Sequence, residues 1–149
     1  MNEPAAFGGG TFIADKSVWA RSNQKPIRDE WERALRAGQI VTCQITVLEL
    51  LYSARSGDEF GKFREELGAL EVLPTSSGTF LAAFDALAAL SEVSHGYHRV
   101  APADALVAAN AHEAGVGVLH YDHDFDRLAE VLSFESRWVA PPGTLDNQG

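Results

Sequence analysis

Short apolar runs alternate with longer segments of helical periodicity along this chain, and this alternation restricts the possible folds more than any other feature. Apolar runs typical of strands lie at residues 11–15, 40–43, 71–74 and 116–120, and a last one lies near Trp138. Strands that alternate with helices pair in parallel and are covered by helices on both faces. The sequence therefore predicts an α/β domain built on a parallel sheet.

Segments with a helical spacing of apolar residues fill the intervals between the strands. We expect helices at residues 17–20, 26–37, 46–55, 58–67, 75–93, 102–113 and 126–132. Pro26 stands in the first turn of its helix and Gly38 just past its end, which are the usual places for these two residues. Thr46 and Glu49 have the spacing of a capping box, so the third helix is predicted to begin at Thr46.

Length and composition limit the class of protein. The chain has 149 residues, enough for one domain, and its single cysteine, Cys43, excludes a disulfide framework. No apolar stretch approaches the ~20 residues of a membrane-spanning helix, and the first residues lack the basic region of a signal peptide, so we expect a cytoplasmic protein. We predict one domain over residues 11–140, a flexible arm over residues 1–10 and a disordered tail over residues 141–149.

The formal net charge is −9, from 12 basic and 21 acidic residues. This balance argues against a protein that coats nucleic acid non-specifically, because such binding comes from lysine and arginine side chains that neutralise phosphates. It leaves open an enzyme that reaches phosphate through metal ions, and it favours a basic partner.

Acidic residues recur where strands end and helices begin. Asp15 ends the first strand, Asp122 follows the fourth strand with Asp124 two residues on, and Glu49 and Asp104 fall in the expected first turns of helices. In open parallel sheets, ligands bind outside the carboxyl ends of the strands. We therefore expect these acids to meet at one edge of the sheet.

Each of these acids also has an ordinary structural explanation. Glu49 could complete the capping box with Thr46, and Asp104 could complement a helix dipole. Asp124 could be a helix N-cap, and Asp15 could form a turn with the residues that follow it.

Two positions are hard to explain in these ordinary ways. Asp15 follows the apolar residues 12–14, where a charge is costly unless it is paired. Asp104 shares a helix face with Val107 and Ala108, the face best able to pack inward. Two carboxylates ~5 Å apart at an effective dielectric of ~20 repel by ~3 kcal/mol, so converging acids need protons or a cation. Ligands that are all oxygen favour Mg²⁺ or Mn²⁺.

Four motifs in this order resemble the PIN-domain nucleases, and among them the VapC toxins of toxin–antitoxin pairs. The motifs are FIADKS at residues 12–17, TVLEL at 46–50, PADALVAANA at 102–111 and LHYDHDF at 119–125. Each is weak alone, whereas the set is specific and spans nearly the whole domain. Two departures are Lys16, whose ammonium could compete with a metal, and the ten residues ahead of the first strand, more than these toxins usually carry.

The resemblance implies a single PIN-like domain with a central five-stranded parallel sheet flanked by helices, usually in a homodimer. It implies an endoribonuclease dependent on Mg²⁺ or Mn²⁺ that acts on structured RNA such as tRNA or rRNA and is neutralised by a cognate VapB-type antitoxin. Asp15, Glu49, Asp104 and Asp122 match the acidic quartet of the family as catalytic and metal-binding residues, and Asp124 matches a frequent fifth metal ligand.

Other interpretations stay open at this point. The principal alternative is a non-catalytic PIN domain that serves as a protein-binding module. His120 and His123 flank Asp122, so a mixed histidine and aspartate zinc site is a further possibility, although we favour the all-oxygen site.

Overall fold

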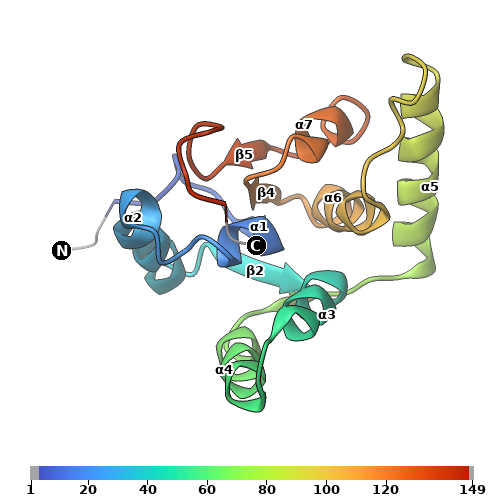
Figure 1. The fold of residues 1–149 in the computed structure, drawn as a ribbon. Helices are drawn as coiled ribbons and strands as arrows, with labels where there is room; N and C mark the ends of the chain where they lie inside the picture. Colours follow the sequence, from blue (N-terminus) through green and yellow to red (C-terminus); the bar gives the residue numbers. More distant parts are fainter. Residues whose placement is uncertain (1–3, 148–149) are drawn as a thin grey trace.

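A computed structural model describes residues 4–147 and shows an α/β fold in which helices cover a central sheet (Figure 1). The strands are β1 (Phe12–Ala14), β2 (Ile40–Cys43), β3 (Val72–Leu73), β4 (Gly117–His120) and β5 (Ser136–Trp138). They pair in parallel in the order β3-β2-β1-β4-β5. The five-stranded parallel sheet is confirmed.

The helices follow the predicted order. They are α1 (Lys16–Trp19), α2 (Lys25–Arg36), α3 (Gln44–Ser53), α4 (Gly57–Gly68), α5 (Ser77–Ser91), α6 (Pro102–Ala114) and α7 (Asp124–Leu128). α6 shows how closely local signals set these limits. Pro102 occupies its first position, and Gly115 ends it with a φ of 69°, a left-handed conformation that glycine adopts without strain. Within residues 4–147, no helix is long and apolar enough to cross a membrane.

Three helices begin two residues away from the predicted start, α3 and α7 before it and α5 after it. α3 begins at Gln44 rather than at Thr46, so Thr46 lies inside the first turn and is fully buried. Its hydroxyl lies 3.4 Å from the sulfur of Cys43, the residue that precedes the helix. The capping box of Thr46 and Glu49 is therefore wrong, and Glu49 lies in the second turn of α3.

The sheet separates two apolar cores because successive strand residues point to opposite faces. Ile13 of β1 and Val118 of β4 belong to the core formed with α5, α6 and α7. Phe12 of β1 and Leu119 of β4 belong to the core formed with α1, α2 and α4. Both faces are thus apolar, as a parallel sheet covered by helices requires.

Parts of both chain ends pack against the domain. Ala6 and Phe7 are buried in the second core, and the backbone N–H of Ala6 donates to Oε1 of Gln39 at 2.8 Å. At the other end Leu145 is 8% exposed, and its backbone N–H donates to the hydroxyl of Tyr121 at 2.9 Å. Ala6 and Phe7 of the predicted arm and Leu145 of the predicted tail therefore pack into the second core. Residues 1–3 and 148–149 lie outside the described part.

The strand order creates one switch point in the sheet. From β1 the chain builds outward through β2 and β3, then returns to add β4 and β5 on the other side of β1. Adjacent connections at β1 and β4 therefore leave in opposite directions, which opens a crevice at their carboxyl ends. Asp15 directly follows β1, and Asp122 lies just beyond β4.

Candidate functional site

Asp15 lies at the carboxyl end of β1 with its side chain fully buried. Its Oδ2 accepts the backbone N–H of Ser17 at 3.1 Å and the Ser17 hydroxyl at 2.6 Å, whereas its Oδ1 is buried without a hydrogen-bond partner. The Ser17 oxygen also accepts the backbone N–H of Tyr121 at 2.9 Å, which ties the end of β1 to the end of β4. Burial raises the pKa of Asp15, the Ser17 bonds lower it, and the charges of Glu49 and Asp122 raise it again.

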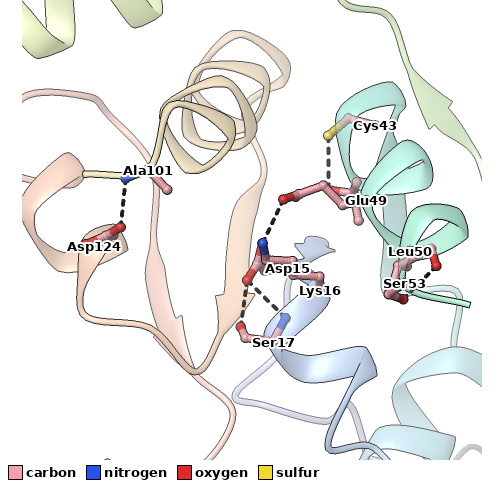
Figure 2. A network of polar contacts seen from close by, with 10 residues as sticks. Asp15, Lys16, Ser17, Cys43, Glu49, Leu50, Ser53, Ala101 and Asp124 are labelled. Atoms are coloured by element: carbon pink, nitrogen blue, oxygen red, sulfur yellow. Dashed lines mark hydrogen bonds and ion pairs between the residues drawn. The ribbon is translucent and has the colours of Figure 1, made fainter. Parts of the chain in front are cut away.

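Asp122 and Asp124 form a turn that joins β4 to α7. Oδ1 of Asp122 accepts the backbone N–H of Asp124 at 2.9 Å. Figure 2 shows that Oδ2 of Asp124 in turn accepts the backbone N–H of Ala101, at 3.0 Å. Because Ala101 directly precedes α6, these bonds bring the turn against the helix that carries Asp104. The N-cap of α7 is His123, so the N-cap explanation of Asp124 is wrong.

Asp104 is the most constrained acid of the group. It stands in the first turn of α6, is 1% exposed, and its Oδ1 has no hydrogen-bond partner. Burial first, and then the charges of Asp15 and Asp122 and a contact with Asp124, raise the pKa of Asp104 to about 9. A favourable helix dipole explains an acid at this position, but it does not explain the burial of an unpartnered oxygen.

Glu49 reaches the same region from the second turn of α3 and is paired with a lysine. Its Oε2 accepts Nζ of Lys16 at 2.8 Å, while its Oε1 is buried without a partner (Figure 2). This bond is the largest cause that raises the pKa of Lys16, ahead of the charges of Asp15 and Asp104. An ammonium group therefore already neutralises part of the acidic site.

The acids together suit a hard divalent cation. Carboxylate oxygens of Asp104, Asp122 and Asp124 lie within 4.8 Å of one another. Two buried side chains at the same place, Asp15 and Asp104, each have an oxygen without a partner. Buried carboxylate oxygens are costly unless they are protonated or coordinated, and oxygen ligands are those that Mg²⁺ and Mn²⁺ prefer.

The two histidines beside Asp122 are engaged in other contacts. The imidazole Nδ1 of His120 accepts the backbone N–H of Asp122 at 3.2 Å, and its Nε2 lies 2.7 Å from the hydroxyl of Ser136. Burial lowers the pKa of His120 to about 4. The His123 ring packs edge-on against Trp138, with the ring centroids 4.8 Å apart. In the described part of the chain, the group able to hold a metal contains carboxylates only.

The structure brings the sequence-predicted acids together from four separate segments. Asp104, Asp122 and Asp124 form the closest group, the charge of Asp15 acts on Asp104, and the charge of Glu49 acts on Asp15. The contacts of His120 with the acidic turn were not predicted from the sequence. The spacing of this histidine two residues before Asp122 was visible in the sequence, but Ser136 lies in another strand and gave no signal.

A cluster of carboxylates at the switch point of a five-stranded parallel sheet is what the PIN-domain resemblance implied, and comparison with family models agrees. The model described as "PIN domain" matches residues 13–131, a range that contains all five acids. Ribonuclease VapC18 from Mycobacterium tuberculosis is 36% identical over 135 residues, with 90% of this chain and 98% of the relative covered. Ribonuclease VapC21 from the same species is 34% identical over 137 residues, with 89% and 96% covered. The chain belongs to the VapC group of the PIN-domain family.

A solved structure shares the fold at lower identity. The DNA-bound VapBC complex from Salmonella typhimurium contains a chain with a TM-score of 0.69 and 21% sequence identity. The match covers 89% of this chain and all of that one, at 100%. At this identity the likeness concerns the fold alone.

Proposed function

We propose that this protein is the toxin of a toxin–antitoxin pair, a metal-dependent endoribonuclease that hydrolyses phosphodiester bonds in RNA. Its curated relatives are named ribonucleases, which supports RNA as the substrate. The observation that carries the proposal is the buried carboxylate of Asp104, with an unpartnered oxygen, within 4.8 Å of Asp122 and Asp124. A structural acid would have its own protein partner, whereas a metal ligand keeps a free oxygen.

The residues divide the work as follows. Asp15, Asp104, Asp122 and Asp124 would hold Mg²⁺ or Mn²⁺, and Glu49 would hold a ligating water or a second ion. A bound ion of this kind lowers the pKa of its water and stabilises charge on the scissile phosphate. Burial of Asp15 and Asp104 fixes both carboxylates before the substrate arrives, so little reorganisation is needed. Products should carry a 5′-phosphate and a 3′-hydroxyl.

A partner groove leads to this site. A cavity of about 1310 Å³ runs between α1, α2, α3 and α4 and reaches Asp122, with apolar side chains such as Leu50 and Phe63 in its lining. The solved structure that shares this fold is a VapBC complex, and the net charge of −9 favours a basic partner. A cognate VapB-type antitoxin therefore binds here and blocks cleavage in the cytoplasm, where the free toxin acts on structured RNA such as tRNA or rRNA.

The experiment that tests the enzymatic proposal is cleavage mapping on total RNA with Mg²⁺ or Mn²⁺. The parent protein should cut and Asp104→Asn should not, while Asp29→Asn, a change at an exposed acid of α2, should cut like the parent. Cleavage that survives EDTA, or that leaves a 2′,3′-cyclic phosphate, would contradict the mechanism. A parent protein that binds its antitoxin but cuts no RNA would support the non-catalytic alternative.

A further inference from the structure

A chain of hydrogen bonds behind the acidic turn starts at Asp126 and ends at the backbone of Asp122. Oδ2 of Asp126 accepts Nε1–H of Trp138 at 3.0 Å, and its Oδ1 accepts the hydroxyl of Ser136 at 2.8 Å. The Ser136 oxygen lies 2.7 Å from Nε2 of His120, and Nδ1 of that ring accepts the Asp122 N–H at 3.2 Å. β4, β5 and α7 supply these residues (Figure 1).

The donor and the acceptor of every hydrogen bond in this series follow from the groups at its two ends. A backbone N–H can only donate, so Nδ1 of His120 must carry the lone pair. The proton of the neutral ring is then on Nε2, and it donates to the Ser136 oxygen. The Ser136 hydroxyl in turn donates to Asp126, which as a carboxylate only accepts. One tautomer of His120 satisfies all the bonds.

This arrangement connects a buried ring to the acidic turn. His120 is fully buried, with its ring stacked on Phe125 at a centroid distance of 5.0 Å. It therefore presents Nδ1 from a fixed position to the first residue of the turn. Asp122 then accepts the Asp124 N–H at 2.9 Å, so both carboxylates near Asp104 depend on the same anchor.

We infer that His120 is a positioning residue whose Nδ1, held as an acceptor by Ser136 and Asp126, sets the place of the Asp122 and Asp124 carboxylates at the metal centre. The inference rests on the proposed function, because it assigns to these carboxylates the role of metal ligands. Groups that orient metal ligands from behind are worth roughly 10–100-fold in metal affinity.

Two substitutions at His120 distinguish a side chain that accepts the Asp122 N–H from one that is polar but does not accept it. In His120→Asn the amide oxygen occupies the place of Nδ1 and can still accept the Asp122 N–H. In His120→Gln the longer amide reaches toward Ser136 and leaves that N–H without an acceptor. Calorimetry with Mn²⁺ should show a dissociation constant raised about tenfold in His120→Gln and changed by less than about threefold in His120→Asn.

The tautomer itself can be read by NMR. Long-range ¹H–¹⁵N correlation spectra should show the Nε2–H tautomer for His120 in the parent and a mixture in Ser136→Ala, with the parent pattern restored in Ser136→Thr. His112 is an internal reference, since its Nδ1 accepts the Ser133 N–H at 2.9 Å about two turns of α6 beyond Asp104. Hydrogen exchange at the Asp122 amide should speed up in His120→Gln and Ser136→Ala.

The outcomes decide separately on the inference and on the metal site. Equal loss of Mn²⁺ affinity in His120→Asn and His120→Gln would assign the effect to packing and overturn the inference, as would full affinity in both. An Nδ1–H tautomer in the parent would also overturn it. If the parent binds no Mn²⁺, the proposed metal site fails, whereas exchange at the Asp122 amide still decides whether His120 positions the turn. Thermal unfolding of each variant identifies a protein that has simply lost its fold.

Discussion

Among single residues, Asp104 combines burial, an unpartnered oxygen and three acidic neighbours. The pKa of this carboxyl is raised from 3.8 to about 9 in the folded protein, first by burial and then by the charges around it. Between these two values the Asp104 carboxyl binds more protons in the metal-free native state than in the unfolded chain, so its contribution to stability falls as the pH rises. The stabilising contribution is complete below pH 3.8 and is lost as the pH passes about 9.

We therefore predict that the melting temperature of the metal-free protein decreases from pH 5 to pH 9, and that Asp104→Asn decreases less steeply. The asparagine mimics the protonated acid and cannot ionise. Mn²⁺ should raise the melting temperature of the parent at pH 8, since a ligand of the native state stabilises it, and should have little effect on the variant. Scanning calorimetry in EDTA and in excess Mn²⁺ measures both. Identical pH profiles for the two proteins would contradict the assignment.

Lys16 gives a second prediction at this scale, because its ammonium lies 2.8 Å from Glu49 inside the acidic site. Removing a positive charge next to a cation site should tighten cation binding. We predict that Lys16→Met lowers the dissociation constant for Mn²⁺ by about threefold to tenfold, as expected for one half-exposed charge a few ångströms away. Lys25→Met, which removes an exposed charge at the start of α2, should leave the constant unchanged. Calorimetric titration checks both, and weaker binding in Lys16→Met would show that this lysine supports the site.

Single elements explain how far the sequence could predict the site. Asp15 and Asp122 were placed correctly because the carboxyl ends of adjacent parallel strands must meet. Glu49 was predicted to reach the same edge, but its predicted capping box with Thr46 was wrong. An acid three residues after a threonine occurs inside helices as well as at their starts. The link between Ser136 and His120 was not predictable, because it depends on the alignment of β5 beside β4.

The turn from β1 into α1 depends on one hydroxyl, which gives a prediction for this element. Ser17 donates to Asp15 at 2.6 Å and accepts from the Tyr121 N–H at 2.9 Å. Ser17→Ala leaves both partners without this oxygen, which should cost about 1–3 kcal/mol in the free energy of unfolding. Ser17→Thr keeps the hydroxyl and should cost less. Urea denaturation measures these values.

The control for Ser17 is Ser22→Ala. That change removes a single hydroxyl, which donates to the backbone oxygen of Trp19 at 3.1 Å in the same region. Its effect should be smaller, because it leaves no buried N–H without an acceptor. An equal loss of stability in Ser17→Ala and Ser22→Ala would mean that the Ser17 bridge between β1 and β4 stabilises the fold no more than an ordinary surface hydrogen bond.

At the scale of the whole molecule, the parallel sheet and its order of elements followed from the alternation of apolar runs, whereas the packed chain ends did not. Ala6 belongs to a very short apolar run ahead of three glycines, and Leu145 is an isolated apolar residue between polar ones, so nothing local indicates that each packs into the second core. Burial of such residues depends on the completed surface of the domain. Sequence patterns predict single helices and strands better than they predict which apolar surface remains exposed once those elements have packed together.

The outer face of α5 is the clearest case of apolar surface that the single chain leaves uncovered. Phe80, Leu81 and Phe84 are 57%, 65% and 70% exposed, and their spacing places Phe80 and Phe84 one turn apart. Contiguous apolar surface of this kind on a helix marks an interface. The homodimer expected from the family resemblance would cover it.

We predict that Phe84→Glu makes the protein monomeric, because the new charge would be buried without a partner between two copies. Asp85→Lys, at the neighbouring exposed position, changes charge by two units and leaves the apolar area intact, so it should stay dimeric. Light scattering coupled to size-exclusion chromatography gives the mass of each species. The acidic site is made within one chain, so monomeric Phe84→Glu should still bind Mn²⁺. A parent protein that is monomeric at high concentration would contradict the predicted homodimer.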